Sequence, residues 1–146
     1  CSDRVPDVWN YKSHVERQGM YNTPATYPIY IAGLVFRWLQ SQGGVEHMET
    51  INTLKAKTLY AAIDGSGGFY QNRVHPGARS KMNVVFTTGN AQLDELFAQE
   101  STTRGLQLLR GYKAVGGMRA SIYNAMPLQG VEALIDFMTE FQKRYG

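Results

Sequence analysis

Two adjacent glycines, Gly43 and Gly44, separate two helical patterns and constrain the fold more than any other feature of the sequence. Before them, apolar residues recur at helical spacing within 31–39, and after them a longer stripe of the same period runs through 45–63. Glycine pairs end helices and let the chain turn sharply. We therefore predict a corner between two helices, with a domain boundary that divides the chain into residues 1–43 and 44–146.

Beyond this corner, patterns typical of strands alternate with patterns typical of helices. Asn90 is well suited to cap the first of these later helices. The candidate elements are helices at 93–105 and 131–141 and strands at 81–87, 106–110 and 118–124. We predict an α+β domain in which a three-stranded sheet carries helices on one face.

The composition excludes several classes of function. Hydrophobic residues make up 43% of the 146, which is enough for a core, and the 15 basic residues form no run that would suit nucleic acid. The longest apolar run, 29–36, is too short to cross a bilayer. Cys1 is the only cysteine, so no internal disulfide can form, and we expect a cytoplasmic location. The three histidines lie far apart, and no spacing suggests a metal site.

Asn22, Thr23 and Pro24 stand just before the first helical pattern. A proline at the first position of a helix leaves the following N–H groups free, and an amide or hydroxyl before it completes a compact anion site. A phosphate would fit such a site. The alternative is ordinary helix capping, which is far more common and is favoured on spacing alone.

Arg119 follows the Gly116-Gly117 pair at the start of a strand candidate. A guanidinium offers a rigid fork that matches a carboxylate, and the glycines would let the backbone carry it close to a ligand. An ion pair between Arg119 and an acidic residue at the strand edge is about equally consistent. Tyr112 and Lys113, just before the glycines, would hold a second anionic group or simply form a solvated turn.

Two motifs resemble the phosphoserine aminotransferases, which are fold-type I, class V enzymes that depend on pyridoxal phosphate. They are MYNTPATYPIYIAGLVFRWLQSQGGV, whose family equivalent runs Asn-Thr-Pro-Pro-Thr into the same apolar helix, and VGGMRASIYNAMP with the helix after it. The resemblance covers essentially the whole chain, as roughly the last two fifths of such an enzyme. It implies the end of the large cofactor domain in 1–43 and the small C-terminal domain in 44–146.

The resemblance implies a homodimer that moves an amino group between glutamate and 3-phosphohydroxypyruvate, in serine biosynthesis and, in many bacteria, pyridoxine biosynthesis. Asn22 and Thr23 would contact the phosphate of pyridoxal 5'-phosphate in the neighbouring subunit's site. Arg119 would bind the α-carboxylate of the substrate and fix its orientation over the cofactor. Tyr112 and Lys113 would help to bind the phosphate of the substrate.

The chain departs from the family in two respects. The lysine that forms the family's Schiff base lies upstream of residue 1, and no lysine here stands in a matching context, so this chain alone is expected to be inactive. Family members also carry His-Arg where this chain has Tyr112 and Lys113. Lys113 keeps a charge but lacks the fork, and Tyr112 cannot become cationic, which puts the acceptor substrate in question.

Two alternatives follow from these departures. One is another fold-type I aminotransferase with a different keto-acid acceptor, which Tyr112 and Lys113 favour slightly. The other is a free-standing α+β binding module without enzymatic activity, which only the length of the chain and the missing lysine support.

Overall fold

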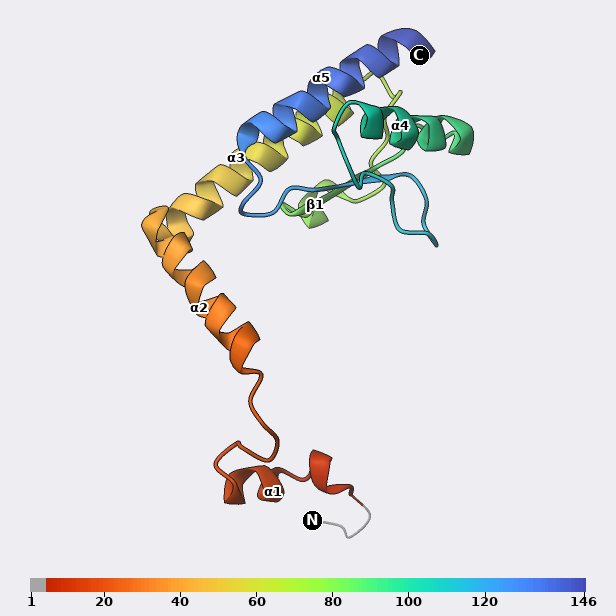
Figure 1. The fold of residues 1–146 in the computed structure, drawn as a ribbon. Coiled ribbons are helices and arrows are strands. Elements are labelled where there is room, and N and C mark those ends of the chain that lie inside the picture. The colour runs from red at the N-terminus through yellow and green to blue at the C-terminus, as the bar shows by residue number, and fades with distance from the viewer. Residues whose placement is uncertain (1–4) are drawn as a thin grey trace. The chain divides into compact units, whose positions relative to one another are not determined.

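The computed structural model describes residues 5–146, which belong to two compact units, Cys1–Ser41 and Gln42–Gly146. Each unit has its own helices, and the second also contains a sheet (Figure 1). In chain order the elements are η1 (Asp7–Trp9), α1 (Tyr11–Glu16), α2 (Thr26–Ser41), α3 (Gly44–Asp64), η2 (Pro76–Ala78), β1 (Asn83–Phe86), α4 (Ala91–Thr103), β2 (Met118–Ser121) and α5 (Leu128–Tyr145).

The first unit is dominated by α2, which confirms the helix predicted around 31–39. The helix begins later than expected: Pro24 lies two residues before it, and the Thr26 N–H donates to the Pro24 carbonyl at 2.8 Å. The prediction that Pro24 takes the first helical position is therefore wrong. None of the residues of α2 is buried within the described chain, although most of them are apolar.

Gly43 and Gly44 separate α2 from α3, and their φ angles of +94° and +78° lie in the left-handed region. A side chain at Gly43 would also crowd His47, because its Cβ would lie 3.1 Å from the His47 Cβ. The predicted helix over 45–63 is confirmed as α3. Its buried stripe contains Met48, Asn52, Lys55, Ala56, Leu59 and Ile63.

The sheet of the second unit pairs β1 with β2 in antiparallel register, so that Val84 faces Ala120 and Phe86 faces Met118. These four side chains are buried, whereas Val85 and its partner Arg119 lie on the opposite face. Successive side chains of a strand point to opposite faces, and β2 alternates apolar and polar residues accordingly, whereas β1 places the apolar Val85 on the more exposed face. The α+β class is confirmed.

A third strand over 106–110 was predicted, and the structure corrects it: the sheet of the described residues has two strands. Leu108 has a φ of +60°, which interrupts the extended backbone that a strand requires. One isolated bridge, between Arg110 and Met118, is all that remains of the pairing. The segment runs beside β2 without continuing its ladder.

An aromatic cluster centred on Phe97 joins α4 to the sheet and to α5. The Phe97 ring centroid lies 4.9 Å from that of Phe137, 5.0 Å from Phe141 and 5.7 Å from Phe86. These contacts are edge-on, the geometry that aromatic pairs prefer. Because Phe97 is fully buried, α4 and α5 are fixed on the same face of the sheet.

Candidate functional site

A closed hairpin over 109–119 carries three of the side chains singled out in the sequence: Tyr112, Lys113 and Arg119. Its neck is closed by two backbone hydrogen bonds, from the Gly111 N–H to the Gly117 carbonyl and from the Arg119 N–H to the Leu109 carbonyl, both 2.8 Å. Within the tip, the Tyr112 carbonyl accepts from two later N–H groups. Tyr112 and Lys113 are exposed at the tip, and Arg119 lies at the base, in β2.

Glycines make this hairpin possible because the backbones approach closely at its neck. A Cβ on Gly111 would overlap the Gly116 carbonyl oxygen, and a Cβ on Gly117 would lie 2.7 Å from the Phe86 oxygen. Gly117 also has a φ of +67°. The sequence led us to expect that Gly116 and Gly117 bring the backbone close to a ligand, whereas in the structure Gly117 brings it close to β1.

Arg119 is a half-buried guanidinium without a carboxylate partner among the residues that the structure describes. Its Nε is buried and has no hydrogen-bond acceptor in the described part of the chain. A buried, unpaired N–H of a charged group costs free energy, so the side chain requires an acceptor. The alternative of a strand-edge ion pair finds no support here, and an anionic ligand would satisfy the group.

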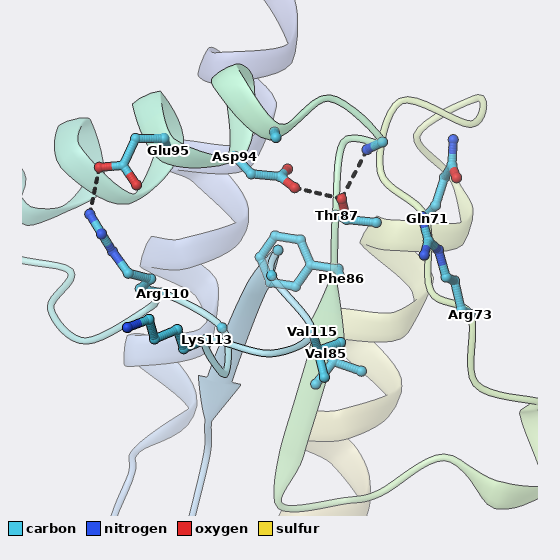
Figure 2. Close-up of a pocket in the computed structure, with 15 residues that line it drawn as sticks. Gln71, Arg73, Val85, Phe86, Thr87, Asp94, Glu95, Arg110, Lys113 and Val115 are labelled. Carbon is cyan, nitrogen blue, oxygen red and sulfur yellow. Dashed lines mark hydrogen bonds and ion pairs between the residues drawn. The ribbon is translucent and has the colours of Figure 1, made fainter.

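An open cleft of about 650 Å³ lies beside the hairpin (Figure 2). Lys113 and Arg110 lie on one side of it, with Gln71 and Arg73 on the other. Arg119 is not part of its lining, but Val85, the strand partner of Arg119, is.

The charges around this cleft are unequally compensated. Arg110 forms an ion pair with Glu95 at 2.5 Å, and Asp94 accepts from the hydroxyl of Thr87 at 2.6 Å. Lys113 and Arg73 have no ion-pair partner within residues 5–146. Asp94 likewise has no cationic partner among these residues, so the lining keeps a small net positive charge, which would favour an anion.

Asn22 and Thr23 lie in the other unit, in the loop between α1 and α2. The preceding residue, Tyr21, anchors this loop: its ring centroid lies 5.2 Å from that of His14 and 4.8 Å from the Arg17 guanidinium carbon. Both Asn22 and Thr23 are exposed, and neither side chain hydrogen-bonds to a described residue. Since α2 begins at Thr26, they do not cap it, and the capping alternative does not hold.

Sequence reasoning missed Arg73, Arg110 and Lys55. Arg110 had a usable signal, because it stands with Lys113 and Arg119 in one short cationic segment around the glycines. Arg73 had none, since only the fold brings it to the cleft. Among residues 5–146, no three His, Cys, Asp or Glu side chains form a metal-like cluster, and no helix is long and apolar enough to cross a membrane.

The α+β fold agrees with what comparison with known proteins finds. The profile of the aminotransferase class-V family matches residues 3–134, so the chain belongs to that family.

Individual relatives are more specific. The phosphoserine aminotransferase of Neisseria meningitidis serogroup A is 67% identical over all 146 residues, which correspond to 40% of that protein. The phosphoserine aminotransferase of Chromobacterium violaceum is 55% identical over 142 residues, 97% of this chain and 39% of that protein. The chain thus spans about two fifths of the length of the curated relatives it matches.

Solved structures give the same family. The phosphoserine aminotransferase from Bacillus circulans subsp. alkalophilus superposes with a TM-score of 0.91 at 39% identity, over 99% of this chain and 40% of that one. A phosphoserine aminotransferase from Trichomonas vaginalis with bound PLP gives a TM-score of 0.83 at 38% identity, over 94% of this chain and 39% of that one.

Proposed function

We propose that this chain is the C-terminal part of a phosphoserine aminotransferase that depends on pyridoxal 5'-phosphate. The complete enzyme would exchange an amino group between glutamate and 3-phosphohydroxypyruvate in serine biosynthesis, and in pyridoxine biosynthesis where that pathway exists. The observation that carries the proposal is Arg119, a half-buried guanidinium with an unsatisfied Nε and no described carboxylate partner. The 67% identity to a phosphoserine aminotransferase supports it.

In this proposal Arg119 binds the α-carboxylate of the amino-acid substrate. A guanidinium donates two parallel N–H bonds to a carboxylate, so the contact fixes orientation as well as affinity. The base of the hairpin holds the side chain in place, because the Arg119 N–H is bonded to Leu109 and the strand is paired with β1. A positioned carboxylate keeps the reacting carbon in one orientation, which lowers the entropic part of the barrier.

Asn22 and Thr23 fit the phosphate of the cofactor. Their amide and hydroxyl are exposed and have no hydrogen-bond partner among the described residues, so both are available to an anion. We propose that they hold this phosphate in the neighbouring subunit of a homodimer. When bound, pyridoxal phosphate supplies an electron sink for the transfer of the amino group. The lysine that anchors it is expected outside this chain, as is the rest of the active site.

Lys113 would contact the phosphate of the keto acid, with Tyr112 as a hydrogen-bond donor. The exposed position of both residues at the hairpin tip supports this role, as does the absence of a described ion pair at Lys113.

A second candidate function, that of an aminotransferase with a different acceptor, is favoured by Tyr112 and Lys113, since Lys113 lacks the two-pronged guanidinium of an arginine. Membership of the aminotransferase family argues against a binding module, and the cytoplasmic location stays a prediction.

Steady-state kinetics of the complete enzyme test the role of Arg119. Replacing Arg119→Ala removes two charge-assisted hydrogen bonds, each worth about 1.5–3 kcal/mol. The KM for glutamate should therefore rise by roughly a hundredfold or more. The double variant Asn22→Ala/Thr23→Ala should instead lose cofactor during dialysis.

Arg104→Ala serves as the matched control, because Arg104 forms only an exposed ion pair with Glu140. Its KM for glutamate should equal that of the unmodified enzyme. If Arg119→Ala also left this KM unchanged, the proposed function of the hairpin would be refuted.

A further inference from the structure

Lys55 of α3 is a fully buried lysine that bonds only to backbone carbonyls. Its Nζ donates to the carbonyls of Tyr123 at 2.8 Å, Met126 at 2.9 Å and Ile122 at 3.2 Å. No carboxylate that the structure describes pairs with it. An ammonium group has three N–H donors, so the three carbonyls satisfy it completely.

Burying a charge in this position costs free energy, which suggests a role that an apolar residue could not fill. Burial lowers the pKa of Lys55 below its ordinary value, because the charged form is removed from water. A methionine would fill the same space in the core without that cost. Three carbonyls that converge on one point nevertheless require the charged form, since a neutral amine has only two N–H donors.

The three carbonyls belong to the irregular segment 122–126, which directly follows β2. The Ile122 N–H still pairs with the Met82 carbonyl at 2.8 Å, and beyond it no ladder holds the chain. One turn before Lys55 on the same helix, the Asn52 amide donates to the Asn124 side chain at 2.8 Å. Lys55 and Asn52 together therefore tie this segment to α3.

We propose that Lys55 is a positioning residue for Arg119. The strand β2 is held at its start by the hairpin neck, through the bonds of Gly111 and Arg119. It is held at its end by the bonds of Lys55, the first of which lies three residues beyond Arg119. With both ends of β2 fixed, the backbone of Arg119 is held in one place, and this determines where its guanidinium lies. This inference rests on the proposed function, in which Arg119 binds the substrate carboxylate.

The test compares Lys55→Met with Lys57→Met in the complete enzyme. Lys57 is exposed on the same helix, so its substitution removes an identical charge and leaves no carbonyl unpaired. Lys55→Met should speed hydrogen exchange of the amides in 122–126 and raise the KM for glutamate by roughly tenfold to a hundredfold. Retention of the cofactor should not change, and Lys57→Met should match the unmodified enzyme in all three measurements.

Faster exchange with an unchanged KM would show that Lys55 is only structural and would overturn the proposal. Should Lys55→Met fail to fold, Lys55→Gln provides the test instead, because its amide keeps two N–H donors for the carbonyls but cannot satisfy all three. A raised KM for glutamate in Lys55→Gln supports the proposal, and an unchanged KM overturns it. Arg119→Ala, measured alongside, separates the two hypotheses: an unchanged KM there refutes the proposed function itself.

Discussion

The tip of the hairpin and its base differ in what their charges contact. Lys113 lines the cleft as a point charge, whereas Arg119 projects from β2 with an unsatisfied Nε. The two residues would therefore serve two different anionic groups of one substrate. Their roles can be separated by changing one at a time.

Replacing the ammonium of Lys113 with a guanidinium, which can form two parallel hydrogen bonds, should improve recognition of a phosphate. Lys113→Arg should lower the KM for 3-phosphohydroxypyruvate by roughly threefold to tenfold, since a guanidinium binds phosphate through two bonds. Lys113→Met should raise this KM, and both variants should leave the KM for glutamate unchanged. Equal changes for phosphorylated and unphosphorylated keto acids would assign Lys113 no part in phosphate recognition.

Sequence patterns predicted those residues of the candidate site that stand close together in the chain. Lys113 stands just before the Gly116-Gly117 pair and Arg119 just after it. Arg73 comes to the cleft only through the fold, and no local pattern distinguishes it from a solvated arginine. Lys55 was missed because a lysine is almost never fully buried without a charged partner, whereas the apolar Leu54 beside it is in fact 51% exposed.

Among the elements, the segment 106–110 shows how one residue can change the course of the chain. Leu106 and Leu108 would share one face of a strand. The left-handed backbone at Leu108 turns its side chain into solvent, where it is 88% exposed, and Leu109 is buried instead. Helices were predicted more accurately, because an amphipathic stripe over four or five turns survives one ambiguous position.

The strain at Leu108 leads to a prediction for this segment. A side chain in the left-handed region costs about 1–2 kcal/mol, and an exposed leucine gains little from packing. Leu108→Gly should therefore raise the free energy of unfolding by about 0.5–1 kcal/mol after allowing for the greater entropy of the unfolded glycine. Urea unfolding followed by circular dichroism measures the change. Leu106→Gly, at a partly buried site of ordinary backbone, should be destabilising.

For the second unit as a whole, an exposed cluster links α4 to the end of α5. Glu100 accepts hydrogen bonds from Tyr145 at 2.7 Å and from Arg144 at 2.6 Å. These bonds, that from Tyr145 first, hold the pKa of Glu100 below its ordinary value. The cluster therefore joins two helices that the core fixes from the other side.

This cluster should make stability depend on pH in acid. Because the pKa of Glu100 is lower in the folded state, its contribution is complete above the ordinary value of 4.5 and is lost as pH falls through the folded pKa. In Glu100→Gln, the midpoint of urea unfolding should fall less steeply with acid than in the unmodified protein. Glu132→Gln, at an exposed glutamate of α5 without a described ion pair, should retain the original slope.

The hairpin neck has a consequence for how such an enzyme can evolve. Backbone groups alone close it, between Gly111 and Gly117, and the tip between them makes no contribution to the pairing of β2. Random changes at the tip are therefore neutral for the position of Arg119, provided that the glycines persist. If residues 112–115 contact the acceptor and Arg119 binds the amino-acid donor, as proposed above, selection could change the acceptor while the donor stays the same.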